Sequence, residues 1–175
     1  MILRVVILIA VLIAGLLVFA ATRPNTFRIQ RSTTIAAPPE KIFALLDDFH
    51  NWPRWAPQDR EDPSIKRIYS GAESGVGAIS EWSGSGSTGA GRMSIIEADP
   101  PGKVTVKVDF LKPFEAHNIN QFVLEPAGGT TVVTWSMHGS NLYMMKLMSI
   151  FTDMDKLMGK HFESGLQNLK VAAEK

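Results

Sequence analysis

The sequence predicts an α+β protein in which a curved antiparallel sheet wraps around a long C-terminal helix, preceded by one N-terminal transmembrane helix. Three observations indicate this architecture. An uncharged apolar run occupies the N-terminus, apolar and polar residues alternate from Ile65 to His138, and apolar residues recur at spacings of three and four after Asn141. An amphipathic helix that follows such a sheet can cover its apolar face and close the core.

The N-terminal apolar run has the length of a membrane span. Between Arg4 and Arg23 lie eighteen residues without a charge. As a helix they would be about 27 Å long, compared with about 30 Å for the hydrocarbon core of a bilayer. We therefore expect a transmembrane anchor at residues 1–21, a linker at 22–26 and a soluble domain at 27–175.

A cleaved signal peptide is the alternative for this segment. Arg4 supplies a short basic region, and residues 18–20 (VFA) form an acceptable cleavage site. Apolar cores of signal peptides usually have about 7–15 residues. Residues 5–20 already supply sixteen, and this length favours the anchor.

The arginines beside the anchor bear on its orientation. Arg4 and the terminal amine stand on one side, and Arg23, Arg28 and Arg31 stand on the other, although the last two can belong to folded structure. We expect the N-terminus inside and the soluble domain on the exported, periplasmic side.

Composition excludes several classes of protein. The soluble part has about 150 residues, which supports one domain with a real core. It is formally neutral, because the net charge of +1 is carried by Arg4 in the anchor, and this argues against nucleic-acid binding. With no cysteine the chain has neither disulfides nor thiolate ligands.

We expect neither a metal nor a cofactor. The four histidines are scattered without the spacing of metal ligands; they are His50, His117, His138 and His161. The glycines of residues 84–89 match a dinucleotide fingerprint, but a strand follows them where that fingerprint requires a helix.

The individual elements follow from local periodicity. A strand is predicted at 27–36, a short helix starts at Pro38 and Pro39, and Trp52 and Trp55 lie in a second short helix or turn. Six further strands are separated by glycine- and proline-rich turns and are predicted at 65–69, 76–83, 91–98, 104–111, 116–125 and 131–138. One amphipathic helix is predicted over 141–175.

Side-chain alternation along the strands predicts the wall of a cavity between the sheet and the last helix. Asn118 and Asn120 are its inward polar groups, and six of the eight methionines lie between Met137 and Met158, which suits a wall that adapts to its ligand. Core packing is the alternative for each single methionine. The predicted ligand-binding residues are Trp82, Met93, Phe110, Asn118, Asn120, Phe122, Trp135, Met137, Phe151, Met154 and Met158.

The predicted inner face offers little for acid–base catalysis. Glu97 is its only titratable group, because the same alternation places Glu81, Asp109 and His117 outward. We therefore expect no catalytic residue, with one alternative: Asn118 and Asn120 could orient a substrate by hydrogen bonds alone.

Several short motifs occur in an order that resembles a known group. They are IAAPPEKIFALLDD at 35–48, the Trp52/Trp55 pair, DP at 62–63, YSGAESGVGA at 69–78, EW at 81–82, EPAGGTTVVTW at 125–135 and FESGLQNLK at 162–170. Together they resemble the START-like, or SRPBCC, superfamily in its polyketide cyclase/dehydrase-like branch, over nearly all of residues 27–175. The resemblance implies a helix-grip fold enclosing a deep apolar cavity, used by relatives for lipid or hydrophobic-ligand binding and, in a minority, for cyclisation.

These observations predict membrane-anchored binding of a hydrophobic small molecule or lipid in an internal cavity. The expected partners are that ligand and the membrane, which the N-terminal helix contacts, and no nucleic acid is expected. A polyketide cyclase or dehydratase is the first alternative. A protein-interaction module is the second, because the resemblance includes relatives that act on chaperones.

Overall fold

The computed structural model describes residues 2–62, 64–85 and 88–175. Seven antiparallel strands form one sheet in the order β1-β7-β6-β5-β4-β3-β2. Each strand from β2 to β7 pairs with its neighbour in sequence, and β1 adds at the edge of β7. The strands are β1 (Thr26–Ile35), β2 (Lys66–Gly71), β3 (Ala78–Ser83), β4 (Ala90–Asp99), β5 (Lys103–Lys112), β6 (Ala116–Ala127) and β7 (Thr130–Ser140).

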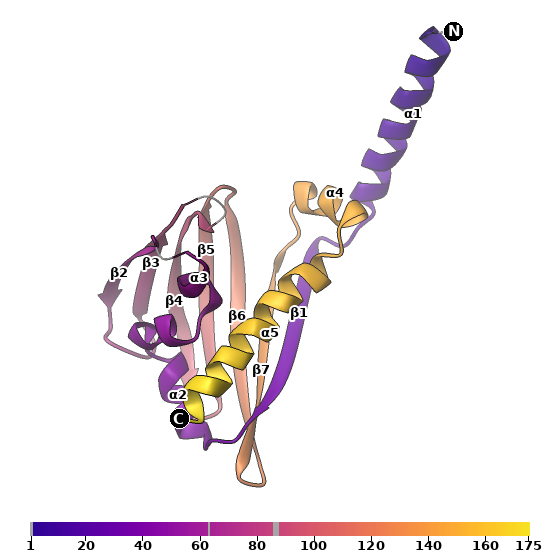
Figure 1. Ribbon diagram of the computed structural model, residues 1–175. Coiled ribbons are helices and arrows are strands. Elements are labelled where there is room, and N and C mark those ends of the chain that lie inside the picture. The colour runs from indigo at the N-terminus through magenta and orange to yellow at the C-terminus, as the bar shows by residue number, and fades with distance from the viewer. Residues whose placement is uncertain (1, 63, 86–87) are drawn as a thin grey trace.

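Helices cover one face of this sheet, and the N-terminal helix projects away from it (Figure 1). The short elements between β1 and β2 pack at one side of the concave face, and the last helix runs across that face. The helical elements are α1 (Ile2–Ala21), α2 (Pro39–Leu46), the 3₁₀ helix η1 (Phe49–Arg54), α3 (Pro57–Glu61), α4 (Tyr143–Phe151) and α5 (Met154–Ala173). The predicted α+β class, with a curved sheet around a long C-terminal helix, is confirmed.

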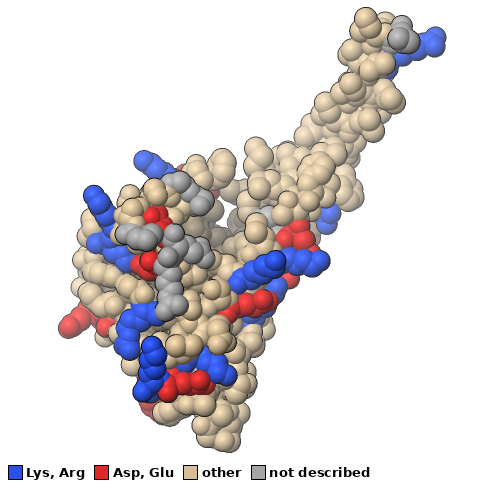
Figure 2. Space-filling view, in the orientation of Figure 1, with Lys and Arg blue, Asp and Glu red and all other residues tan. Residues whose placement is uncertain are grey.

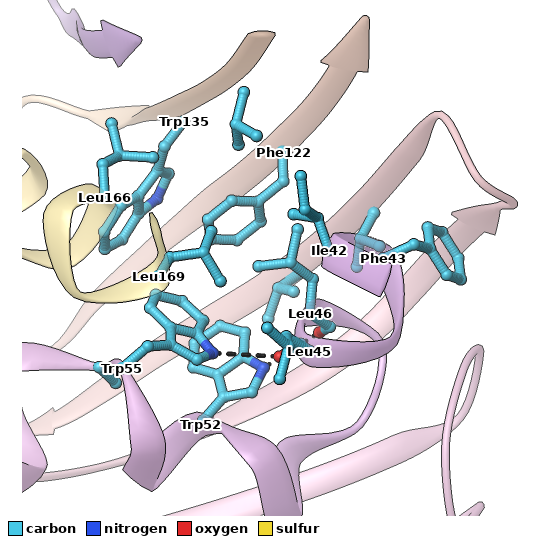
Figure 3. Packing of buried hydrophobic residues seen from close by; sticks show 14 of the residues in the cluster. Ile42, Phe43, Leu45, Leu46, Trp52, Trp55, Phe122, Trp135, Leu166 and Leu169 are labelled. Atoms are coloured by element: carbon cyan, nitrogen blue, oxygen red, sulfur yellow. Dashed lines mark hydrogen bonds between the residues drawn. The ribbon is translucent and has the colours of Figure 1, made fainter. Parts of the chain in front are cut away.

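The core lies between the concave face of the sheet and α2, η1 and α5 (Figure 3). Trp135 of β7 stacks on Phe162 of α5 with ring centroids 4.1 Å apart and planes within 3°, and its other contacts include Phe122 at 5.1 Å. The indole N–H groups of Trp52 and Trp55 donate to the carbonyl oxygens of Leu46 and Leu45, each at 3.0 Å. These bonds attach η1 to the end of α2 without leaving a buried donor unpaired.

Ion pairs hold the first half of α5 on the edge strand. The guanidinium of Arg31 in β1 lies 2.9 Å from carboxylate oxygens of both Asp155 and Glu163. Arg28 also lies in β1. Two of the three arginines that follow the anchor therefore belong to folded structure and say little about membrane orientation.

The C-terminal segment differs from the expected single helix over 141–175. Thr152 takes an extended conformation after α4, and the carboxylate of Asp153 accepts from the backbone N–H of Lys156 at 3.1 Å, so that a new helix starts there. An aspartate cap favours such a start. Apolar spacing continues through both helices, which is why it did not indicate the break.

The predicted inward position of Glu97 is wrong. The pairing of β4 with β5 shifts register between Ile95 and Glu97, as a β-bulge does, and the side-chain alternation changes from that point. The carboxylate of Glu97 lies half-exposed on the outer face, 2.6 Å from the ammonium of Lys103, and it accepts from the hydroxyl of Thr105 at 2.9 Å.

Within the described part of the chain, α1 is the one helix long and apolar enough to cross a membrane. Its side chains are exposed over most of its length. Figure 2 shows the surface of this helix as uncharged between its base and its tip. Length and composition of this kind are shared by membrane anchors and signal sequences.

Replacing Gly165 with alanine should destabilise the fold. A Cβ at this position of α5 would lie 2.6 Å from Cζ3 of Trp135, a ring fixed by its neighbours. Overpacking costs about 1–3 kcal/mol, and the better helix propensity of alanine returns only about 1 kcal/mol. We expect the free energy of unfolding, measured by urea denaturation in detergent, to fall by up to about 2 kcal/mol.

Gly102→Ala is the matched control, because its added Cβ would meet only the carbonyl oxygen of Asp99, at 3.8 Å. Its effect should stay within about 0.5 kcal/mol. Equal stabilities of the two variants would contradict the tight contact between α5 and Trp135.

Candidate functional site

A cavity of about 270 Å³ lies between the concave face of the sheet and the first half of α5. Its walls are mainly aromatic, aliphatic and thioether side chains, with a few polar groups among them. The lining residues are Trp52, Trp55, Ala56, Gln58, Ile65, Arg67, Trp82, Thr88, Met93, Val108, Phe110, Asn120, Trp135, Met137, Met158, His161 and Phe162. An apolar cavity with few polar groups is typical of a small-molecule site.

The cavity lies toward one end of the sheet. Its partly exposed lining residues include Ile65 before β2, Trp82 near the end of β3, Thr88 before β4 and Phe110 near the end of β5. In an antiparallel sheet β1 starts and β7 ends at this same end. The linker from α1 and the connection to α4 therefore leave the sheet at the end toward which the cavity lies. Figure 1 shows these two connections close together at the base of α1.

Seven of the eleven predicted ligand-binding residues lie on the cavity wall: Trp82, Met93, Phe110, Asn120, Trp135, Met137 and Met158. Trp135 is almost completely buried and Trp82 is half-buried, so the register used for the prediction is correct for these strands. Binding by these residues stays a prediction.

The other four predicted residues lie elsewhere. Phe122 is fully buried behind Trp135, and the amide of Asn118 lies over the backbone of Gly139, where a Cβ would collide with its Oδ1 atom. Phe151 is 75% exposed on α4, because the break before α5 turns that helix away from the cavity. The side chain of Met154 lies outside the described residues.

Two residues of the cavity wall each carry a polar atom that is buried without a hydrogen-bond partner in the described part of the chain. These atoms are the Oδ1 atom of Asn120 and the Nε1 atom of Trp135. A buried polar group without a partner costs about 1–3 kcal/mol. One acceptor and one donor on an apolar wall can both be satisfied by a molecule that carries a hydroxyl group.

A buried ion pair on the wall escaped the sequence analysis. Nε and Nη2 of Arg67 lie 2.7 Å from the two carboxylate oxygens of Asp59, and both side chains are only 8% exposed. The Nη1 atom of Arg67 also donates to the buried hydroxyl of Ser80 at 3.3 Å. The alternation in β2 puts Arg67 on the same face as Tyr69, which is the signal that could have indicated it.

The sequence analysis also missed several residues that helices contribute to the cavity wall. Trp52 and Trp55 come from η1 and its C-terminal end, where no period of two or 3.6 applies. His161 follows Met158 by three residues on α5 and so shares its helical face. All four tryptophans of the chain line the cavity.

Asp62 joins the two loops beside the cavity. Its carboxylate accepts from the hydroxyl and backbone N–H of Ser64 and from the backbone N–H of Ser85 at 2.9 Å, so it connects the segment after α3 to the β3–β4 hairpin. The hydrogen bond from the Ser64 hydroxyl is the main reason that the pKa of Asp62 lies well below its usual range. The DP motif at 62–63 thus owes its aspartate to loop structure, and Pro63 lies outside the described residues.

Two of the scattered histidines lie on the outer face of the sheet. His117 is exposed, with its Nδ1 atom 2.6 Å from the carboxylate of Asp109, and His138 is exposed on β7. Over the described residues, no three histidine, aspartate or glutamate side chains are grouped so that they could hold a metal ion.

Comparison with known proteins places this geometry in a family. The sequence matches the family described as "Polyketide cyclase / dehydrase and lipid transport" over residues 26–174. Comparison with curated proteins gives no match.

Solved structures agree on the fold. Ginseng major latex-like protein 151 from Panax ginseng superposes with a TM-score of 0.62 at 16% identity, covering 87% of this chain and 100% of its own. The Aha1 dimer from Colwellia psychrerythraea gives a TM-score of 0.58 at 20% identity, covering 85% of this chain and 96% of its own. Protein CV1439 from Chromobacterium violaceum gives a TM-score of 0.59 at 16% identity, covering 87% of this chain and 99% of its own.

Identities this low establish the fold alone. The family match, by contrast, includes the whole sheet and all of α5, and it confirms the resemblance found in the short motifs. This protein therefore belongs to the polyketide cyclase / dehydrase and lipid transport family, with an apolar helix preceding the family fold.

Proposed function

We propose that this protein is a membrane-anchored binder of a hydrophobic small molecule or lipid. Residues 1–21 are the anchor, 22–26 the linker and 27–175 the binding domain, on the exported side of the membrane. The observation that carries the proposal is the apolar cavity with its two unpartnered polar atoms, which lies at the sheet end joined to α1.

The cavity supports a particular size and chemistry of ligand. Its volume of about 270 Å³ is near the lower end of the range of about 300–1,000 Å³ for small-molecule sites. This favours a compact apolar molecule, or a single chain, over a complete two-chain lipid. The donor of Trp135 and the acceptor of Asn120 favour a ligand with one hydroxyl group.

Contacts at the base of α1 support the anchor over a cleaved signal peptide. Ala20, at the possible cleavage site, is fully buried, and the hydroxyl of Tyr143 donates to the carbonyl oxygen of Leu17 at 2.9 Å. Cleavage after this point would remove the partner of Tyr143 and the packing of α1 against α4.

A cyclase or dehydratase is the second candidate, and Arg67 and His161 on the cavity wall are the observations that favour it. The guanidinium of Arg67 is engaged by the carboxylate of Asp59 through two of its nitrogens, and the described lining contains no aspartate or glutamate. General acid–base catalysis needs a group that is free to exchange a proton. Binding without chemistry is therefore the better-supported function.

The N-terminal helix should remain attached in the mature protein. We expect the chain isolated from membranes to have the intact mass of residues 1–175, apart from loss of the initiator methionine, and to resist extraction with alkaline carbonate. A chain that begins at Ala21 and is found in the soluble fraction would contradict the anchor.

Replacing Asn120 with leucine should weaken ligand binding, because the substitution removes the acceptor from the cavity wall. Loss of one such hydrogen bond costs about 1–3 kcal/mol, or roughly five- to 150-fold in affinity. The measurement is quenching of tryptophan fluorescence by a naphthol probe, which combines an apolar ring system with one hydroxyl, since all four tryptophans line the cavity.

Asn118→Leu is the matched control, because this neighbouring amide is buried off the cavity wall. His117→Ala and His138→Ala, on the outer face, should change the binding free energy by less than about 0.5 kcal/mol. Equal losses for Asn118→Leu and Asn120→Leu would contradict a specific role of Asn120.

A further inference from the structure

Helix α4 exposes an apolar face that no described part of the chain covers. Met144, Met148 and Phe151 are spaced by four and three residues, so they share one side of the helix. They are 57%, 46% and 75% exposed. Exposed apolar side chains grouped in this way indicate a contact surface rather than ordinary scatter.

The one charge of α4 lies on its other side. Lys146 is 7% exposed, and its ammonium donates to the side-chain oxygen of Asn25 in the linker after α1. In Figure 2 the surface over α4, beside the base of the projecting helix, is uncharged, whereas charged side chains gather along α5. The exposed face of α4 is therefore wholly apolar and is held next to the anchor.

The contact with α1 fixes where α4 lies along the length of α1. The hydroxyl of Tyr143 donates to the carbonyl oxygen of Leu17, which lies four residues before the end of α1 at Ala21. Four residues correspond to about 6 Å along a helix. If α1 crosses the bilayer over its whole length, Tyr143 reaches the last turn of the span, at the depth where tyrosine is enriched.

We propose that α4 lies in the interface of the bilayer with Met144, Met148 and Phe151 inserted among the lipid chains. The partner that covers this face is thus the membrane itself, in the manner of an interfacial amphipathic helix. Two further exposed apolar side chains lie at the same end of the sheet. They are Leu111 near the end of β5, which is 56% exposed, and Phe114 in the β5–β6 connection, which is 66% exposed.

This proposal rests on the anchoring part of the proposed function and extends it. Since the partly exposed wall of the cavity lies at the same end of the sheet, an embedded α4 holds that wall next to the lipid surface. A hydrophobic ligand could then pass between bilayer and cavity with little exposure to water. A second copy of the chain is the competing partner for the apolar face.

The absence of cysteine permits a direct test with single labels. The full chain carrying Met148→Cys is labelled with the environment-sensitive fluorophore NBD. It is then reconstituted in vesicles of phosphatidylcholine and phosphatidylglycerol, with and without lipids that carry a spin label either near the headgroup end or near the middle of one chain. Val171→Cys on α5 is the matched control, because its exposure of 44% equals that of Met148 within a few per cent. Leu12→Cys, in the middle of α1, reports on the anchor.

We expect NBD at position 148 to shift its emission to the blue and to lose most of its intensity to the spin-labelled lipids, and NBD at 171 to do neither. Quenching at position 12 without quenching at 148 would overturn the placement of α4 and leave the anchor standing. A blue shift at 148 without quenching would also overturn it, because the face would then be covered by protein. No quenching at position 12 would overturn both the anchor and this proposal.

Discussion

The stacking of Trp135 on Phe162 is the contact on which the rest of the structure depends. It joins β7 to α5, and Trp135 also meets Phe122 of the neighbouring strand and Trp55 after η1. Gly165 permits the approach, since any side chain at that position would enter the ring of Trp135. The same indole forms part of the cavity wall, and its N–H is buried without a hydrogen-bond partner among the described residues.

One consequence is that the cavity and the core are built from the same residues. The cavity remains because α5 is held at the aromatic cluster by Phe162 and near its start by Arg31, while Met158 and His161 cover the space between these points. Methionine on such a wall can change conformation at little cost, because its side chain is unbranched and flexible. The wall therefore combines a rigid aromatic side with an adaptable one.

Burial of the ion pair between Arg67 and Asp59 costs free energy, so a need to fill space does not by itself explain why the pair is there. Burying two charges is expensive, and an apolar pair of similar volume is often as stable or more so. The pair keeps a polar group on the wall while leaving the wall neutral. A neutral, mainly apolar wall with few hydrogen-bonding atoms fits an uncharged ligand better than an ionised one.

Periodicity predicted which face of each strand a residue occupies, and little beyond that. Trp82, Trp135 and Met137 lie on the expected face because their strands keep strict alternation. Alternation predicts which face a side chain occupies but not how deeply it is buried, so it predicts Phe122 on the wall, whereas the structure buries it behind Trp135. The prediction for Glu97 is wrong because of a β-bulge, and a single sequence does not indicate bulges reliably.

Other features of the site could not be predicted because they come from segments that are distant in the sequence or have no regular period. The pairing of Asp59 with Arg67 joins α3 to β2, and Trp52 and Trp55 reach the cavity from a segment without regular period. The break before α5 was hidden because apolar residues continue to recur at spacings of three and four through both α4 and α5, although Asp153 is a good helix cap. Phe151 was misplaced for that reason, and the same break turns α4 toward the base of α1.

Native mass spectrometry of the full chain, released from lipid nanodiscs, tests the central claim most directly. The account predicts a single apolar molecule bound to the native chain and its absence from Val108→Phe, which fills the cavity from β5. A native chain without any bound molecule, or the same molecule on both chains, would contradict ligand binding in this cavity.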